Sequence, residues 1–303
     1  MKYQTGNKTN FLSAMKTKQF LTTGILGIAL AGMVITGCKK ESTADTDATA
    51  AQDDANASFM LNDSKNISDG AAKGQANERT LGTTCGVITW GDTVIGTTKD
   101  SLIDIFFPGT CISPDYRLRK GHIRVYWNGK GYFQDSASIS ETWYNYSVTT
   151  LGGTTIGITG VRTLTNIGKD SLGDHSWAFN ANLALSYSSG GGCTWNSSRT
   201  NILSKIGSQW YYSTTGSASG TSKSGNQYTL TITQPLIYTA FWLNGGWPAW
   251  GGTYCDCIES GQVELTRSGK TYPLYLTFTS GVGSCKRTAT ATINGNNYNI
   301  TLP

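Results

Sequence analysis

The chain has 303 residues, of which only 14% are charged, and its formal net charge is +5. Four lysines precede residue 38 with no acid to balance them, which leaves 20 basic and 19 acidic side chains in the remainder. A nearly neutral chain has no general attraction for nucleic acid or acidic lipid, so composition argues against a nucleic-acid-binding protein. The 37 glycines and many aromatic residues favour a β protein with many turns.

The N-terminal stretch has the features of an export signal. Lys16 and Lys18 precede an apolar run, Phe20–Val34, which ends in small residues before Cys38. The sequence Ile35-Thr36-Gly37-Cys38 resembles the lipobox of bacterial lipoproteins, in which the cysteine receives a diacylglycerol and becomes the first mature residue. The alternative is a retained transmembrane helix, but four glycines and three threonines make residues 20–37 a poor one.

We therefore expect residues 1–37 to be a lipoprotein signal peptide, starting at Met1 or at Met15. Lys39 stands where an Asp is the usual inner-membrane retention signal, so the resemblance implies the outer membrane. The expected localisation is the outer membrane, lipid-anchored, on its cell-surface or periplasmic face.

Residues 38–80 form a polar segment without an apolar period. Residues 39–80 hold eight acidic and five basic side chains among many Ala, Asn, Ser and Thr. Such a composition cannot bury enough apolar surface to offset the entropy lost on ordering. We expect a disordered tether, with a short helix around Ala57–Leu61 as the alternative, because its apolar residues gather there.

The residue pattern of 81–303 differs from that of the polar segment before it. Short runs of β-branched and aromatic residues alternate with clusters of Gly, Asn, Ser or Pro, which is typical of strands and turns. The strands expected are Cys85–Trp90, Ser101–Phe107, Gly121–Trp127, Ser138–Tyr146, Gly157–Thr165, Ser176–Tyr187, Cys193–Leu203, Gln209–Thr215, Gln227–Thr233, Gly261–Arg267, Leu274–Thr279, Lys286–Ile293 and Tyr298–Leu302.

A weak internal repeat suggests that the domain has two related halves. Residues 85–129 and 257–295 each read cysteine, strand, strand, cysteine, strand and Asn-Gly, with cysteine spacings of 26 and 28 residues. Asn-Gly between strands predicts a tight hairpin, because both positions need positive φ. The expected fold is all-β and antiparallel, a β-sandwich or meander in one β-rich domain spanning residues 81–303.

The start of this domain carries a recognisable pattern. The chain reads Phe107-Pro-Gly-Thr-Cys111 and then Asp115-Tyr-Arg117-Leu-Arg119-Lys-Gly-His-Ile123. This resembles uncharacterised β-rich lipoproteins of the Bacteroidota, which carry a Gly-x-Cys, Asp-Gly-Arg-x-Arg-x-Gly-x-Ile pattern. The resemblance covers most of residues 81–303, although Tyr116 replaces the usual Gly. It implies a membrane-anchored β domain and brings no functional residue with it.

Six cysteines remain once Cys38 is set aside, and an even count in an exported protein favours disulfides. Of the three pairings given next, the internal repeat supports the first two, and the other possible pairings of six cysteines stay open. The pairings are Cys85–Cys111, Cys257–Cys285 and Cys193–Cys255. Cys255 and Cys257 would share one face of a strand and could bind a metal with two other cysteines. An oxidising compartment favours disulfides instead, so we expect no metal and no cofactor.

Signals of catalysis are weak. The two histidines, His122 and His175, lack metal-binding spacing, and no nucleophile-elbow motif occurs. A basic cluster beside Asp115, Arg117 to Arg124, is better explained as a solvated turn than as an anion site. We expect a binding or structural protein rather than an enzyme. The alternative, a secreted carbohydrate-active enzyme, would need two carboxylates about 5–10 Å apart.

One aromatic cluster is the candidate ligand site. Trp242, Trp247, Trp250 and Tyr254 lie in a stretch rich in Gly and Pro. Exposed aromatics of this kind stack on sugar faces or anchor a protein partner, whereas in a hairpin folded over the core they would be buried. The expected partners are the membrane, through the lipid, and a glycan or another surface protein, but no nucleic acid.

Four positions fit an Asp-Ser/Thr-apolar pattern, with Thr93, Ser101, Ser136 and Ser171 as the acceptors. The pattern resembles the O-glycan acceptor motif of exported Bacteroidota proteins, which implies O-glycosylation at these side chains. Turn chemistry is the alternative, since Asp with Ser or Thr also starts turns.

Overall fold

The computed structural model describes residues 45–73, 85–95, 98–113, 117–128, 130–150, 152–239, 258–279 and 288–301. These residues form one helix, α1 (Thr49–Ala72), followed by thirteen strands. The strands are β1 (Val87–Ile95), β2 (Thr98–Ile112), β3 (Leu118–Trp127), β4 (Ser138–Thr149), β5 (Thr155–Lys169), β6 (His175–Tyr187), β7 (Gly192–Ile206), β8 (Gln209–Thr221), β9 (Gln227–Thr239), β10 (Ser260–Arg267), β11 (Leu274–Thr279), β12 (Thr288–Ile293) and β13 (Asn296–Thr301).

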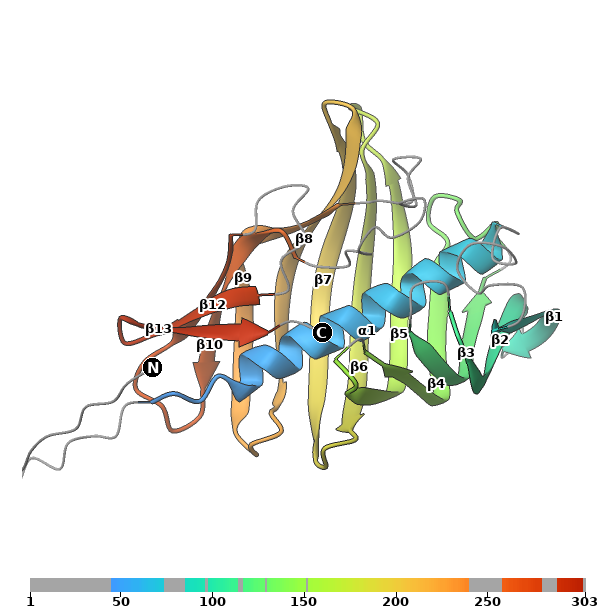
Figure 1. Cartoon of the computed structure of the whole chain (residues 1–303). Coiled ribbons are helices and arrows are strands. Elements are labelled where there is room, and N and C mark those ends of the chain that lie inside the picture. Colours follow the sequence, from blue (N-terminus) through green and yellow to red (C-terminus); the bar gives the residue numbers. More distant parts are fainter. Residues whose placement is uncertain are drawn as a thin grey trace, which may run out of the picture. The chain divides into compact units, whose positions relative to one another are not determined.

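The thirteen strands form one antiparallel sheet in which each strand pairs with the next along the chain (Figure 1). The expected all-β antiparallel meander is therefore confirmed, and every expected strand overlaps an observed one. The described residues form one sheet rather than the two packed sheets of a sandwich. The hairpin predicted at Asn294-Gly295 joins β12 to β13, with φ values of 48° and 76° that this tight turn requires.

The sheet has one buried face and one solvated face. Along β6, buried and exposed side chains alternate from Trp177 to Tyr187, as a strand with one covered face demands. The buried side chains, such as Ile123, Trp195 and Leu230, form the core. We call this side the helix face and the opposite side the outer face.

Helix α1 lies across the helix face and crosses the strands (Figure 1). Eighteen of its 24 residues are buried, including polar ones. Met60 and Ile67 are almost inaccessible and belong to the same apolar core as the sheet. Thr49–Ala72 is therefore not the disordered tether that composition predicted.

The polar residues of α1 are buried because the sheet supplies partners for them. Asp54 accepts hydrogen bonds from the indole of Trp195 and the guanidinium of Arg199, both at 2.7 Å. Ser64 and Ser68 donate to Glu141 of β4. These partners lie more than 70 residues away in the chain, so no local periodicity could reveal them.

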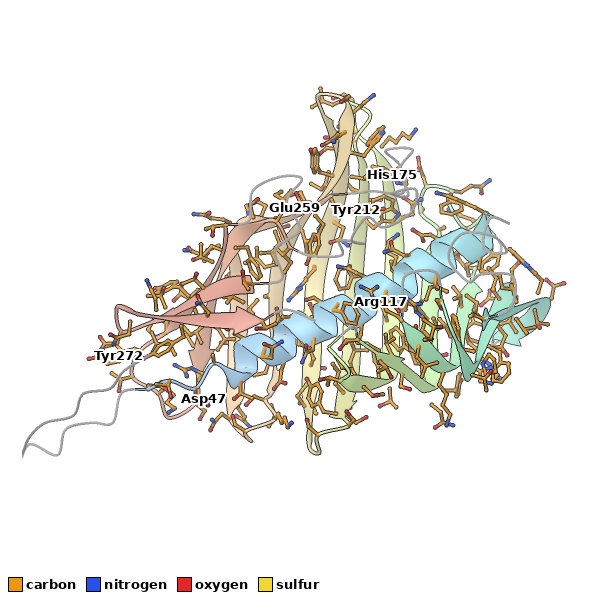
Figure 2. The ribbon with its side chains drawn as sticks, viewed as in Figure 1. Asp47, Arg117, His175, Tyr212, Glu259 and Tyr272 are labelled. Atoms are coloured by element: carbon orange, nitrogen blue, oxygen red, sulfur yellow. The ribbon has the colours of Figure 1, made fainter. Side chains whose placement is uncertain are left out.

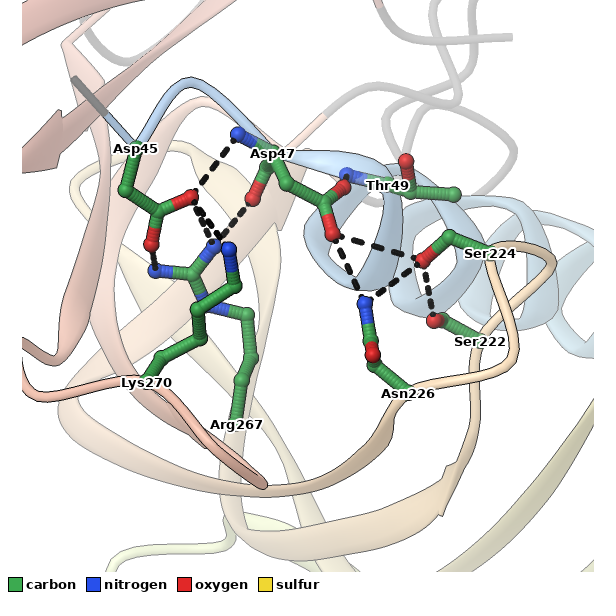
Figure 3. Close-up of polar contacts among 8 residues, drawn as sticks. All are labelled: Asp45, Asp47, Thr49, Ser222, Ser224, Asn226, Arg267 and Lys270. Atoms are coloured by element: carbon green, nitrogen blue, oxygen red, sulfur yellow. Dashed lines mark hydrogen bonds and ion pairs between the residues drawn. The ribbon is translucent and has the colours of Figure 1, made fainter. Parts of the chain in front are cut away.

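The segment before α1 is also fixed to the sheet (Figure 3). Asp45 binds Arg267 at 2.8 Å and Lys270 at 3.2 Å, beside the turn after β10. Asp47 accepts hydrogen bonds from Asn226, in the turn between β8 and β9, at 3.0 Å and from the backbone N–H of Thr49 at 3.0 Å. The helix is thus held where it starts as well as along its length.

Candidate functional site

The tryptophan cluster predicted as a ligand site lies outside the described residues. Trp242, Trp247, Trp250 and Tyr254 fall between the end of β9 and Ile258. Their role in binding therefore stays a prediction. Cys38, the predicted lipidation site, lies outside the described residues as well.

The predicted pairing of Cys193 with Cys255 is wrong. Cys193 is a free, buried thiol on the helix face, 3.5 Å from the hydroxyl of Tyr187. Burial raises its pKa to about 12, so the thiol stays protonated and unreactive near neutral pH. The expected export and the even count of cysteines did not reveal that this strand position faces the core.

The other two pairings stay predictions. The sulfur of Cys85 lies 3.3 Å from the carbonyl oxygen of Ile112, the residue that follows Cys111. The side chain of Cys111 lies outside the described ones, as do Cys257 and Cys285. In the described part of the chain, no three His, Cys, Asp or Glu side chains group as metal ligands.

The basic cluster lies on β3 and the residue before it and divides between the two faces of the sheet, which corrects the expectation of a solvated turn. Arg117 and Arg119 are buried and bind Asp63 of α1, with nitrogen–oxygen distances of 3.1 and 3.0 Å. Arg119 and its neighbours on alternate positions face the helix, whereas Arg124 lies on the outer face. The buried pair is a structural ion pair rather than an anion site.

Another group of aromatic side chains is exposed on the outer face of β2, β3 and β4. Phe106, His122 and Tyr144 are successive cross-strand partners, and we call them the aromatic row. Phe106 is 39% exposed and Tyr144 is 45% exposed. The rings of Phe106 and His122 stack with centroids 4.6 Å apart and planes inclined by 33°. Exposed aromatic surface next to polar groups is typical of a binding site.

Charged side chains hold the aromatic row in place. Asp104 lies 3.1 Å from Nδ1 of His122 and 3.5 Å from Nε of Arg124. The guanidinium of Arg124 lies 4.6 Å from the ring centroid of Tyr144, within the range of a cation–π contact. Partial burial acts to lower the pKa of Arg124, but the Asp104 carboxylate outweighs it and raises the pKa above its usual value.

A β-bulge directs Tyr144 outward. The pairing of β3 with β4 shifts register between Lys120 and His122, and Gly121 and Asn145 both have positive φ, at 96° and 52°. A Cβ on Gly121 would lie 2.2 Å from the carbonyl oxygen of Asn145, so only glycine permits this close approach. Bulges re-aim side chains in this way, and here Tyr144 and Asn145 are both exposed.

The aromatic row was not found from the sequence because its members are 16 and 22 residues apart. Only the strand register brings them together. The available signal was the alternation in β3, which places His122, Arg124 and Tyr126 on one face.

The proposed glycan acceptors occupy different environments. Ser136 and Ser171 are exposed in turns, and Ser101 is half-buried in β2. The side chain of Thr93 is not among those described. Asp170, before Ser171, accepts hydrogen bonds from the backbone N–H groups of Leu172 and Asp174, which is turn chemistry. Modification at these sites stays a prediction.

Comparisons with protein families, with curated proteins and with solved structures each returned no match. Within the described residues, no helix is both long enough and apolar enough to span a membrane.

Proposed function

We propose that this chain is a lipid-anchored β protein of the outer membrane or cell surface that binds a neutral glycan through the aromatic row. The observation that carries the proposal is the row of Phe106, His122 and Tyr144 on three adjacent strands, in which Phe106 and Tyr144 are exposed and His122 is half-buried. Planar rings lose little rotamer entropy on binding, and those of a preformed row lose less still.

The chemistry of the row suits a sugar. The C–H face of a sugar ring is apolar and can stack on Tyr144 or Phe106, while its edge hydroxyls need hydrogen-bond partners. Asp104 and Arg124 supply an acceptor and a donor beside the rings. The two charges largely cancel, so the row favours an uncharged ligand.

Membrane attachment rests on a separate feature, the lipobox-like sequence Ile35-Thr36-Gly37-Cys38. An anchored domain with an exposed binding row would hold glycan at the cell envelope. This part of the proposal can fail without affecting the binding site.

The alternative is a secreted carbohydrate-active enzyme. Such an enzyme needs a pair of carboxylates at the cleaved bond. Among the described side chains that form the aromatic row or hold it in place, Asp104 is the one carboxylate. The buried acids of α1, such as Asp54 and Asp63, are bound by arginines of the sheet side instead. Binding without hydrolysis is therefore the function that the described geometry favours.

The test is glycan binding by Phe106→Ala and Tyr144→Ala variants of the full chain. A panel of neutral gluco-, manno- and xylo-oligosaccharides would be screened by calorimetry. Each variant should lose roughly tenfold or more in affinity, because aromatic anchors dominate binding energy. The free energy of unfolding should change little, since both side chains are well exposed.

Tyr272→Ala provides the matched control. Tyr272 is 48% exposed in the turn between β10 and β11, at the opposite end of the sheet from the row (Figure 2). It should bind like the wild type. Equal binding by all three variants, or no binding of any neutral glycan by the wild type, would overturn the proposal.

A further inference from the structure

A groove on the outer face lies over β7, β8, β9 and β10. Its volume is about 530 Å³, and its lining includes Asn196, Ser219, Thr229 and Thr266. Arg267 borders it, but this side chain is 0% exposed and its guanidinium binds Asp45. The groove therefore offers hydroxyl and amide groups and almost no charge.

Strand register joins this groove to the aromatic row. Arg124, beside the row, pairs with Thr142, and the cross-strand partners continue without a gap into the groove. We call this line the polar row: Arg124, Thr142, Val161, Asn182, Asn196, Ser219, Thr229 and Thr266. Cross-strand partners share one face of a sheet, so the polar row is one line on the outer face.

A second line of uncharged side chains runs beside the polar row. Thr163, Asn180, Ser198, Ser217 and Thr231 are successive partners from β5 to β9. Surfaces designed for solubility are given about 25–35% charged side chains, and both lines lack them over five strands. Solubility alone does not require such a surface, whereas its hydroxyl and amide groups suit a ligand rich in hydroxyls.

We propose that the groove is a second subsite for the same ligand and that the ligand is an extended, uncharged polysaccharide lying along the polar row. This inference rests on the proposed glycan-binding function and adds the length and neutrality of the chain. β3 and β9 are six strand spacings apart, which is roughly 29 Å at about 4.8 Å for each spacing. A mono- or disaccharide cannot cover that distance, but a linear polymer can.

The side chains in the groove suit this role. The hydroxyls of Thr229 and Thr266 lie 2.6 Å apart and can each still accept a hydrogen bond. Asn196 is exposed and adds an amide with both donors and acceptors. Two linked subsites convert the second contact into an intramolecular event, so affinity should depend on the length of the ligand.

The test measures affinity against length in neutral gluco-, manno- and xylo-oligosaccharides, graded from a disaccharide to one that spans both subsites. In the wild type, the longest should bind on the order of 100-fold more tightly than the shortest. Thr229→Lys places a bulky charge in the groove and should abolish this gain in affinity with length. The affinity for the shortest ligand should not change. Asn196→Ala with Ser219→Ala should reduce the gain without adding charge.

Thr288→Lys is the matched control, because it adds the same charge at an exposed position of β12 outside the groove. It should keep the full gain, and thermal midpoints should show that all variants fold. The inference is overturned if the affinity of the wild type does not depend on ligand length, or if Thr229→Lys keeps the full gain in affinity with length. If short ligands still bind in either case, the proposed glycan-binding function stands. A change from dimer to monomer in Thr229→Lys, with glycan binding intact, would also overturn it and assign the face to contact between copies.

Discussion

At the scale of single residues, the helix face depends on carboxylates that each bind several donors. Asp63 accepts hydrogen bonds from Arg117, Arg119 and the hydroxyl of Tyr146. Burial acts to raise the pKa of Asp63, but the guanidiniums of Arg119 and Arg117 outweigh it and hold the pKa below 3.8. Asp63 thus stays charged and serves as the shared acceptor for three buried donors.

Asp63→Ala should therefore be strongly destabilising. Removing one partner from a buried ion pair leaves the other charge uncompensated, which costs about 3–5 kcal/mol, and here two arginines lose their acid. Urea unfolding would measure the loss. Asp135→Ala, at a side chain that is 70% exposed, should change stability by less than about 0.5 kcal/mol. Similar losses in both variants would show that Asp63 has no special role.

The same residue gives stability a dependence on pH. The folded-state pKa of Asp63 is depressed, so its contribution is present above the unfolded value near 3.8 and is lost as pH falls through the folded pKa. Asp53 acts in the opposite sense, because burial raises its pKa and its contribution is lost as pH rises. Urea midpoints between about pH 3 and 5 should fall with acid in the wild type and fall less in Asp63→Ala.

At the scale of elements, strands were predictable and their lengths were not. The expected Gln227–Thr233 strand stops before Pro235, which lacks an N–H for the ladder. In the structure β9 continues to Thr239, because its register against β10 shifts opposite Gln234. Gly261 makes the shift possible, since a Cβ there would lie 2.4 Å from the carbonyl oxygen of Pro235.

The sequence offered only a short helix around Ala57–Leu61, and the full extent of α1 was not predictable because its stability comes from the sheet. It has no side-chain cap at its N-terminus, no acid in the first turn and no base in the last. Its Asp, Asn, Ser and Thr residues are poor helix formers that favour competing local hydrogen bonds. The side chains that hold it, such as Arg199 and Glu141, belong to distant strands.

A peptide of residues 45–73 should therefore be mostly unfolded in water. In proteins, most of the stability of a helix comes from tertiary packing, and this helix also lacks caps and charge complementarity. Far-ultraviolet circular dichroism would measure its helicity, with trifluoroethanol as the control for helix-forming capacity. A peptide that is strongly helical in water alone would contradict the dependence on the sheet.

At the scale of the whole molecule, the fold class followed from local pattern and the candidate site did not. Alternation and turn residues are local, so all thirteen strands could be located. The aromatic row and the polar row exist only through strand register, which links residues such as Phe106 and Tyr144 across separate hairpins. The helix-face ion pairs are equally non-local, which is why Arg117 and Arg119 were expected in solvent.

The N-terminal sequence predicts how the molecule is held, and this too can be tested. Lipidation at Cys38 would attach more than one acyl chain, and two chains hold a protein stably where one does so marginally. Cys38→Ala should release the protein from the membrane fraction or leave an uncleaved precursor, as cell fractionation and intact mass would show. Ser42→Ala, four residues further on, should stay anchored with the lipid mass. If Cys38→Ala keeps the fractionation and processing of the wild type, another segment holds the chain at the membrane.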